Sequence, residues 1–531
     1  MQDLQLYKEL NAHWKTTSKV ILGEEIGELS DFEEWLSGKI PPVVSAKSAN
    51  SGKDVSFVLP HKPEKANAIS LDEIDFNKKF EALDINEIKD IDSILEAVQE
   101  RIYYCGNMIL GNSTYIEKST DVIESHYCYD SAQVSYSKHI SHCYNFEYSD
   151  SVFGSVNFGY CKYCVSVSAA TYATRCFEVS NTVTCSDSLY SNGLFGCSNC
   201  IFSFNQRNAN YRIGNLQLTP QKYADLKKKL VSEIAELLKK DKQLPDLFSF
   251  FSGRGVEPSS LDDVRKRYVP GKGELKDQRI IEKAFKETTG VVLGRQLTDI
   301  ERYGPWLKEN TRTTRSVKSA LSGDTVIIPD HGHIFSYPAN RIVSQEEAVL
   351  VGTSLHLEPE EVESLKLSNA GDFISKIGFF TYIENIGKCA NNIKSEITID
   401  SVNFLDSITI IQSRNGAFNH YVLQAEHIFG CNSVRKSSFL INCYLSASLS
   451  RCFEVDSSSE CSDCYFCHNC ENVRDSMFSF NLKSKRNSIG NEELPKEKYL
   501  SIKEKILEEI SGRIEKDGKL NFGILNLGRT I

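Results

Sequence analysis

The sequence predicts an α+β fold made of two tandem modules, each with an α-rich N-terminal part, a β-solenoid of hexad repeats and a C-terminal capping helix. Three observations lead to this prediction. Small residues recur at every sixth position, the second half of the chain repeats the first, and apolar residues with helical spacing flank each repetitive stretch. With 531 residues, the chain is long enough for several domains with substantial cores.

A six-residue repeat begins at Ser113 and ends at Ser203. Neither a helix nor a flat strand keeps every sixth residue on one face, so the chain must turn back once per hexad or once every few hexads. This period is typical of a β-solenoid, in which equivalent side chains stack into ladders. We expect each buried serine to find its hydrogen-bond partner in a serine of the neighbouring turn. The small positions are Ser113, Ser119, Ser125, Ser131, Ser137, Cys143, Ser149, Ser155, Cys161, Val167, Ala173, Val179, Cys185, Ser191, Cys197 and Ser203.

The second half of the chain duplicates the first. Residues 176–244 align without a gap to residues 452–520, at an offset of 276. Nearer the N-terminus the two copies still align, now at an offset of 271, so that Leu22-Gly23 matches Leu293-Gly294. The phrases that recur include Arg175-Cys176-Phe177-Glu178-Val179 as Arg451-Cys452-Phe453-Glu454-Val455, and Ile213-Gly214-Asn215 as Ile489-Gly490-Asn491.

The duplication and the repeats predict seven segments. In the first module they are an α-rich part (1–100), a β-solenoid (101–216) and a capping helix (217–250). A linker over 251–263, which is rich in Gly, Pro and Ser, precedes the second module. The second module repeats the order with an α-rich part (264–376), a solenoid (377–492) and a capping helix (493–531).

Two stretches of each module predict helices. Leu22, Ile26, Leu29, Phe32 and Trp35 have the spacing of one helical face. After the solenoid, Thr219 followed by Pro220 suits a helix start, because proline at the first helical position loses no hydrogen bond. An apolar stripe follows that start, and we expect this helix to cover the open end of the solenoid. The stripe is Tyr223, Leu226, Leu230, Ile234 and Leu237, matched by Tyr499, Ile502, Ile506 and Ile510.

Composition narrows the classes of function. The net charge is −10, which does not indicate binding to nucleic acid or to an anionic membrane. The first ten residues carry Asp3, Lys8 and Glu9 and lack the apolar core of a signal peptide, and no run of about 18 apolar residues occurs. We therefore expect a cytoplasmic protein with no membrane contact. The 17 cysteines should then be mostly reduced.

The sharpest chemical motif is Cys461, Cys464, Cys467 and Cys470, with a C-x2-C-x2-C-x2-C spacing. Such runs bind zinc or iron–sulfur clusters. A spacing of three is also what the solenoid core requires, and the first module has Cys185, Ser188, Ser191 and Leu194 at the matching places. We therefore favour a core ladder without a cofactor, and keep a metal site at the four cysteines as the alternative.

Histidines give two weaker hypotheses. Asp330 precedes His331-Gly332-His333, which could place two imidazoles on one face of a strand. Hexad repeats also occur in left-handed β-helix acyltransferases, but here the small residue follows the aliphatic one after three positions instead of four. The histidines of the repeats do not fall at matching positions in the two modules; they are His126, His139, His142, His420, His427 and His468.

One resemblance covers most of each module. It rests on Tyr103-Tyr104-Cys105-Gly106-Asn107, on Arg175-Cys176-Phe177-Glu178, on Phe202-Ser203-Phe204-Asn205 and on Ile213-Gly214-Asn215. In these phrases the chain resembles a group of uncharacterised, duplicated Ser/Cys hexad-repeat proteins from uncultivated archaea and candidate-phylum bacteria. The resemblance implies a β-solenoid and a cytoplasmic location. It implies no activity, substrate or cofactor.

The sequence therefore favours a non-enzymatic structural or assembly protein. A duplicated solenoid offers long repetitive surfaces, and duplication fuses two subunits of what was a symmetric contact. We expect such surfaces to serve self-association or docking to a larger complex, as a homo-oligomer or as part of a protein complex. The alternatives are a metalloprotein that uses Cys461 to Cys470 and a solenoid acyltransferase.

Overall fold

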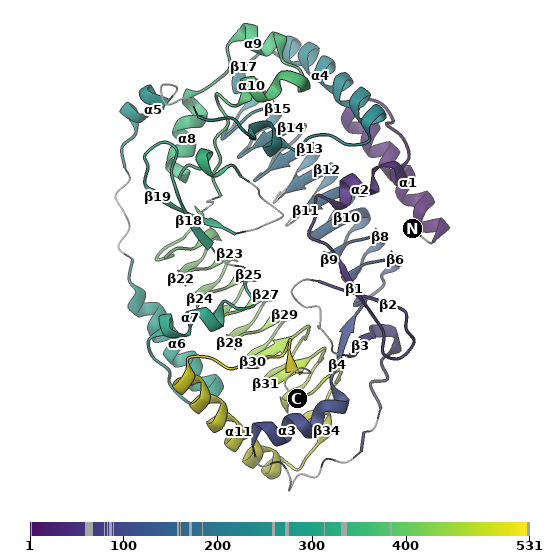
Figure 1. Cartoon of the computed structure of the whole chain (residues 1–531), viewed down its shortest axis with the longest axis vertical. Coiled ribbons are helices and arrows are strands. Elements are labelled where there is room, and N and C mark those ends of the chain that lie inside the picture. The colour runs from purple at the N-terminus through teal and green to yellow at the C-terminus, as the bar shows by residue number, and fades with distance from the viewer. Residues whose placement is uncertain are drawn as a thin grey trace.

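The computed structural model describes all of the chain except residues 2, 59–66, 79, 82, 84–87, 89, 157–158, 160, 169–172, 183, 257–260, 271–275, 313, 331–336, 383–384 and 528–531. The fold combines helices with two large sheets of mainly parallel strands, which confirms the α+β class. Figure 1 shows the two sheets on opposite sides of an elongated molecule, with helices along the outer edge. No helix within the described residues unites the length and the apolar character that crossing a bilayer requires.

The first large sheet, which we call the first stack, has 13 strands. Neighbouring strands are parallel except at the last pair, β16 and β17. The strands are β5 (Ile109–Leu110), β6 (Thr114–Glu117), β7 (Thr120–Ile123), β8 (His126–Tyr129), β9 (Ala132–Ser135), β10 (Lys138–Glu147), β11 (Asp150–Val156), β12 (Lys162–Ser168), β13 (Thr174–Ser180), β14 (Leu189–Asn192), β15 (Ser198–Ile201), β16 (Asn210–Ile213) and β17 (Leu216–Gln217).

The second large sheet, the second stack, has 15 strands and also ends in one antiparallel pair. Its strands are β20 (Asn385–Ile386), β21 (Glu396–Ile399), β22 (Val402–Leu405), β23 (Ile408–Ile411), β24 (Arg414–Ala417), β25 (His420–Leu423), β26 (Glu426–Phe429), β27 (Asn432–Arg435), β28 (Ser438–Ile441), β29 (Tyr444–Ala447), β30 (Ser450–Asp456), β31 (Ser462–His468), β32 (Arg474–Met477), β33 (Arg486–Ile489) and β34 (Glu492–Glu493).

Three small sheets accompany the stacks. Two are antiparallel hairpins and the third is a parallel pair. The hairpins are β1 (Val44–Lys47) with β2 (Asp54–Phe57) and β18 (Thr314–Lys318) with β19 (Thr325–Pro329), and the parallel pair is β3 (Asn67–Ser70) with β4 (Tyr103–Gly106).

The register fixes the number of residues in one turn of each stack. Lys138 pairs with Asp150 in the first stack, and His420 pairs with Asn432 in the second. The partners are twelve residues apart, so one turn, which we call a coil, contains two hexads. The six-residue period of the sequence is therefore half a coil.

The backbone bends more often than the hexad implies. Non-glycine residues with positive φ recur at every third position through both stacks, as at Tyr115, Lys118, Asp121 and Glu124. Each coil therefore has four corners, and each corner is a residue in the left-handed region. Each side of a coil, between two corners, carries one inward side chain. Small inward residues alternate with larger apolar ones along the chain, and this alternation produces the six-residue period.

The serines of the hexads bond to one another across neighbouring coils, through the backbone N–H of one serine and the Oγ of another. Ser125 Oγ accepts a hydrogen bond from the backbone N–H of Ser137 (3.0 Å) and donates to the backbone carbonyl of Ile123 (2.7 Å). The second stack repeats the pattern, because Ser401 Oγ accepts from the N–H of Ser413 at 3.1 Å. The expected serine-to-serine ladder is therefore present, and in it the backbone N–H of one coil bonds to the serine hydroxyl of the coil before it.

One long helix lies along the outer side of each stack. α1 packs against β6, β8 and β10–β13, and α6 packs against β22, β24, β26, β28 and β30. α4 starts at Pro220 with Thr219 as its N-cap, as predicted, and it packs against β16 and α1. The helices are α1 (Leu4–Leu22), α2 (Glu33–Ser37), α3 (Ile91–Val98), α4 (Pro220–Asp241), α5 (Asp262–Arg267), α6 (Gln278–Leu293), α7 (Ile300–Leu307), α8 (Gln345–Ser354), α9 (Pro359–Ser364), α10 (Ala370–Ile374) and α11 (Lys496–Asp517).

The apolar face expected from Leu22 to Trp35 is divided between separate elements. α1 ends at Leu22 because Gly23 takes the left-handed conformation (φ 80°) and closes the helix, and α2 begins only at Glu33. α6 ends in the same way at Gly294 (φ 71°). The predicted apolar residues are nevertheless buried together, since Ile26, Leu29 and Phe32 belong to the core beside the first stack.

The serine ladder gives a direct test of the coil structure. Ser191 is fully buried, accepts from the N–H of Ser203 at 3.0 Å and donates to the carbonyl of Leu189 at 2.9 Å. We expect Ser191→Ala to lower the free energy of unfolding by about 1–3 kcal/mol, because the Ser203 N–H loses its acceptor. Chemical denaturation measures this loss. Ser448→Ala, at an exposed corner, is the control, and equal effects of the two changes would contradict the ladder.

Candidate functional site

The four cysteines of the C-x2-C motif occupy the four successive inward positions of one coil in the second stack. All four are buried, with exposures between 0 and 2%. Each thiol donates to the backbone carbonyl two residues before it: Cys461 to Ser459 (3.2 Å), Cys464 to Ser462 (3.4 Å), Cys467 to Tyr465 (3.5 Å) and Cys470 to His468 (3.5 Å). These are the contacts of a core residue.

The spacing of the four sulfur atoms does not gather them around one point. A tetrahedral zinc site with Zn–S bonds of about 2.3 Å brings its sulfurs to about 3.8 Å from one another. Among the described residues, only Glu9, His13 and His139 place three potential ligand atoms within 4.8 Å of one another. The metal site at these cysteines stays a prediction of the sequence.

The two other hypotheses drawn from the sequence rest on histidines. His331 and His333 lie outside the described residues, and Asp330 is exposed just after the end of β19. Burial lowers the pKa of His142 to about 4 and that of His420 to about 3. Such imidazoles are weak general bases near neutral pH. The acyltransferase alternative therefore gains no support from these two histidines.

The two halves of the chain exchange contacts at the ends of the stacks. Asn205, at the end of the first stack, donates through Nδ2 to the carbonyl of Phe379 at 2.8 Å. Asn481, at the equivalent place in the second stack, donates to the carbonyl of Tyr103 at 2.9 Å. Both the donors and the acceptors are related by the offset of 276. Each half therefore closes the stack of the other.

Further contacts strengthen each of these two seams. At the first, Leu357 N–H donates to the carbonyl of Gly214 at 2.9 Å, and Gln206 Nε2 donates to that of Gly352 at 2.6 Å. At the second, Arg101 Nη1 donates to the carbonyl of Gly490 at 2.6 Å. Gly214 and Gly490 are equivalent positions, and each has positive φ.

Buried side chains add to the second seam. The hydroxyl of Tyr104 donates to the carbonyl of Ile524 at 2.6 Å. The backbone N–H of Cys105 donates to Nε2 of His468 at 2.8 Å, and Nδ1 of the same ring lies 2.8 Å from Asp456. A carboxylate, an imidazole and a backbone N–H thus form a buried chain of hydrogen bonds between residues that are distant in sequence.

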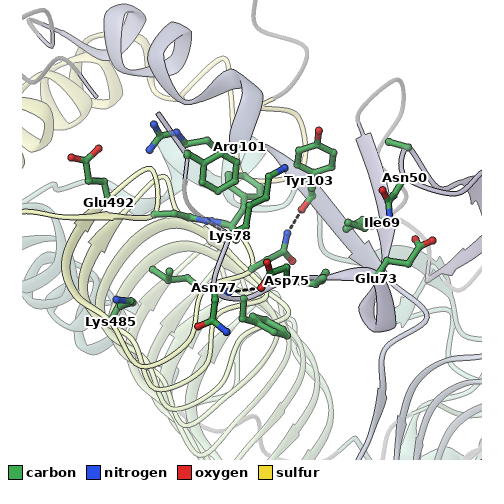
Figure 2. A pocket seen from close by; sticks show the side chains of 18 of the residues that line it. Asn50, Ile69, Glu73, Asp75, Asn77, Lys78, Arg101, Tyr103, Lys485 and Glu492 are labelled. Atoms are coloured by element: carbon green, nitrogen blue, oxygen red, sulfur yellow. Dashed lines mark hydrogen bonds between the residues drawn. The ribbon is translucent and has the colours of Figure 1, made fainter. Parts of the chain in front are cut away.

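A cavity of about 730 Å³ lies at the second seam, between described residues of the range 49–103 and the last coil of the second stack (Figure 2). Several of the charged groups that line it make local contacts. Glu73 accepts from Ser48 Oγ (2.6 Å), Glu492 accepts from the N–H of Leu83 (2.7 Å), and Lys485 pairs with Glu493 (2.6 Å). We therefore interpret the cavity as a space left where two parts of the chain pack together.

Two equivalent glutamates are buried inside the molecule in different environments. Glu178 lies 2.6 Å from Lys39 Nζ and accepts from the N–H of Leu247. Glu454 accepts from the N–H of Ile524 at 2.8 Å and from Asn442 Nδ2 at 3.0 Å. Burial raises the pKa of Glu454 to about 8. The second half thus holds a carboxyl group that keeps its proton at neutral pH.

Sequence reasoning missed one group of polar side chains. Glu9 and His13 lie one turn apart on α1, and His139 lies on β10. The spacing of four between Glu9 and His13 was a visible signal, but only the packing of α1 on the first stack brings His139 to them.

Comparisons with protein families, with curated proteins and with solved structures gave no match to this chain.

The assignment of the cysteines to the core can be tested with a substitution that the first stack already contains. Ser188 stands in the first stack where Cys464 stands in the second, and it donates to the carbonyl of Ser186 at 3.0 Å. Because serine makes the same bond, we expect Cys464→Ser to change stability by no more than about 1 kcal/mol and to leave the metal content unchanged. Thermal melting and elemental analysis of anaerobically purified protein measure both. Loss of one metal equivalent would reverse the assignment to the core.

The pKa of Glu454 predicts a dependence of stability on pH. A folded-state pKa of about 8, above the usual value of 4.5, means that the group's favourable contribution is present below pH 4.5 and is lost as the pH rises toward 8. We expect Glu454→Gln to become more stable than the wild type above pH 8, by up to roughly 5 kcal/mol. Urea denaturation at pH 5 and pH 9 measures the difference.

The equivalent change in the first half is the control for this experiment. Glu178→Gln removes the partner of Lys39, whose side chain is only 14% exposed. We expect that variant to be less stable than the wild type at pH 9, because it leaves a buried ammonium group unpaired. The same sign of change in both variants would contradict the different roles assigned to the two glutamates.

Proposed function

We propose that this protein is a non-enzymatic structural or assembly protein in which two tandem α-plus-solenoid modules form a pseudo-dimer that associates with further copies of itself. The observation that carries the proposal is the exchange at the seams. Asn205 bonds to Phe379, and Asn481 bonds to Tyr103, at the same offset. In a symmetric dimer of single modules, these would be two copies of one contact between subunits.

The exchange covers the ends at which solenoids otherwise join. The last coil of a solenoid exposes unpaired backbone groups and an open core, and it invites the addition of another strand. Here α8 lies on the end of the first stack, where a Cβ at Gly352 would come within 2.0 Å of the carbonyl oxygen of Asn205. α3 takes the corresponding place beside Gly490, where Val98 is the nearest side chain. End-to-end growth is thus blocked, and the lateral surfaces remain for association.

One lateral corner of the first stack carries exposed aromatic rings. Tyr136 and Tyr148 are 52% and 49% exposed, and their rings stack with centroids 5.4 Å apart. The equivalent corner of the second stack carries Gln412 and Gln424, joined by a hydrogen bond of 2.9 Å. Tyrosine is enriched at the centres of protein interfaces. The tyrosine corner of the first stack is therefore the proposed contact with a second copy.

The comparison of the two corners supplies the test. We expect native mass spectrometry to show a defined oligomer of the wild-type chain, and Tyr136→Ser with Tyr148→Ser to shift it to the monomer, because the apolar contact is lost. Gln412→Ser with Gln424→Ser is the matched control and should keep the wild-type mass. A wild-type chain that is monomeric at micromolar concentration would refute self-association, and a control that also dissociates would refute the assignment to the tyrosine corner.

A further inference from the structure

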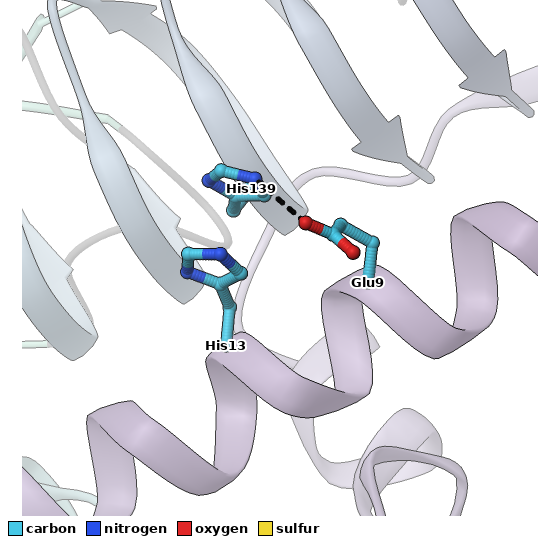
Figure 3. A group of neighbouring side chains, drawn as sticks. All are labelled: Glu9, His13 and His139. Carbon is cyan, nitrogen blue, oxygen red and sulfur yellow. Dashed lines mark ion pairs between the residues drawn. The ribbon is translucent and has the colours of Figure 1, made fainter.

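A second cluster lies apart from the seams and from the tyrosine corner, where α1 packs along the first stack. Glu9 and His13 project from one side of α1 toward His139 on β10, as Figure 3 shows. One donor atom from each residue lies within 4.8 Å of the other two. All three side chains are partly exposed, so solvent ions reach them.

Neighbouring residues hold the Nδ1 atom of each imidazole ring and leave the ring free to pivot about that contact. Nδ1 of His139 lies 3.1 Å from Asp150 Oδ1, and Nδ1 of His13 lies 2.9 Å from Ser151 Oγ. Asp150 and Ser151 are consecutive residues of β11. In metal sites, the ring nitrogen that does not bind the metal commonly donates to a carboxylate or another oxygen in this manner. Nε2 of each ring is then the nitrogen left for an ion, and Nε2 of His139 lies 3.9 Å from Glu9.

Two carboxylates lie beside the two imidazoles. Glu9 lies 3.9 Å from Nε2 of His139, and Asp150 lies 3.1 Å from Nδ1 of the same ring. The two negative charges would balance the charge of a divalent ion.

We propose that Glu9, His13 and His139 bind one divalent transition-metal ion, best matched by Zn²⁺, through two imidazole nitrogens and one carboxylate. This donor set is typical of zinc sites that keep a further position for water. The two rings are stacked with centroids 3.4 Å apart and planes within 8°. Because each lone pair lies in the plane of its ring, binding turns the rings out of this stack so that both converge on the ion.

The second half of the chain provides a natural comparison. There Nε2 of His427, on β26, lies 3.5 Å from Glu287 on α6, so a helix and a stack again share an imidazole and a carboxylate. The positions equivalent to His13 and His139 are Ala284 and Asn415, and the second imidazole is missing. One imidazole and one carboxylate make a much weaker zinc site, and His427 is therefore a matched control.

The proposal is tested by titrating the full-length protein with ZnCl₂ in a calorimeter. We expect one zinc ion per wild-type chain, and at least a tenfold loss of affinity in His13→Asn and in His139→Asn, while His427→Asn keeps the wild-type affinity. Zinc should also raise the melting temperature of the wild type and not that of His13→Asn. Bound Co²⁺ should give a visible absorption band in the wild type that His139→Asn loses.

Three outcomes would overturn the site. They are an absence of zinc binding by the wild type, unchanged affinity in both His13→Asn and His139→Asn, and loss of the same zinc ion in Cys464→Ser, which would assign it to the thiols. Circular dichroism checks that each variant is folded. The result is independent of self-association, because the tyrosine corner contributes no ligand and the double tyrosine variant should bind zinc as the wild type does.

Discussion

The hydrogen bond between a backbone N–H and the serine Oγ twelve residues earlier is the interaction on which the stacks depend. Every third residue takes the left-handed conformation, which costs an L-residue about 1–2 kcal/mol. Such a backbone persists only where the next coil fixes it. Serine supplies an acceptor for that coil and a donor for its own, as Ser137 does with Ser149 and Ser135.

The sequence was informative where a residue type has one physical role. The period of six predicted a solenoid because small residues alternate with larger apolar ones in its interior, and Cys461 to Cys470 lie inward as their spacing indicates. The corners were invisible, since residues as different as Tyr115, Lys118 and His139 adopt the left-handed conformation there. The serine partner in the neighbouring coil was predicted, but the sequence did not show that a backbone N–H donates in that contact and that the hydroxyl itself donates to a carbonyl of its own coil.

Contacts between segments that are distant in the sequence could not be predicted either. Duplication of the chain indicated two similar parts, but it could not show that each part closes its partner instead of itself. Glu9 and His13 form a visible pair on a helix, yet nothing in the sequence connects them with His139. The two glutamates illustrate how the copies diverge. Burial raises the pKa of both carboxyl groups, and the ion pair with Lys39 opposes the rise at Glu178. Asn310 stands at the place of that lysine in the second half, so Glu454 has no such cation beside it.

The exchange of end contacts has a consequence for synthesis on the ribosome. The segment that closes the second stack, around Tyr103, is made long before that stack is complete, so its closing partner is already waiting. The first stack has no such advantage, because its end at Asn205 stays open until Phe379 has left the exit tunnel. At about 5–20 residues per second, that interval lasts roughly ten to thirty seconds. The nascent N-terminal half is therefore the stage at which chaperones have most reason to bind.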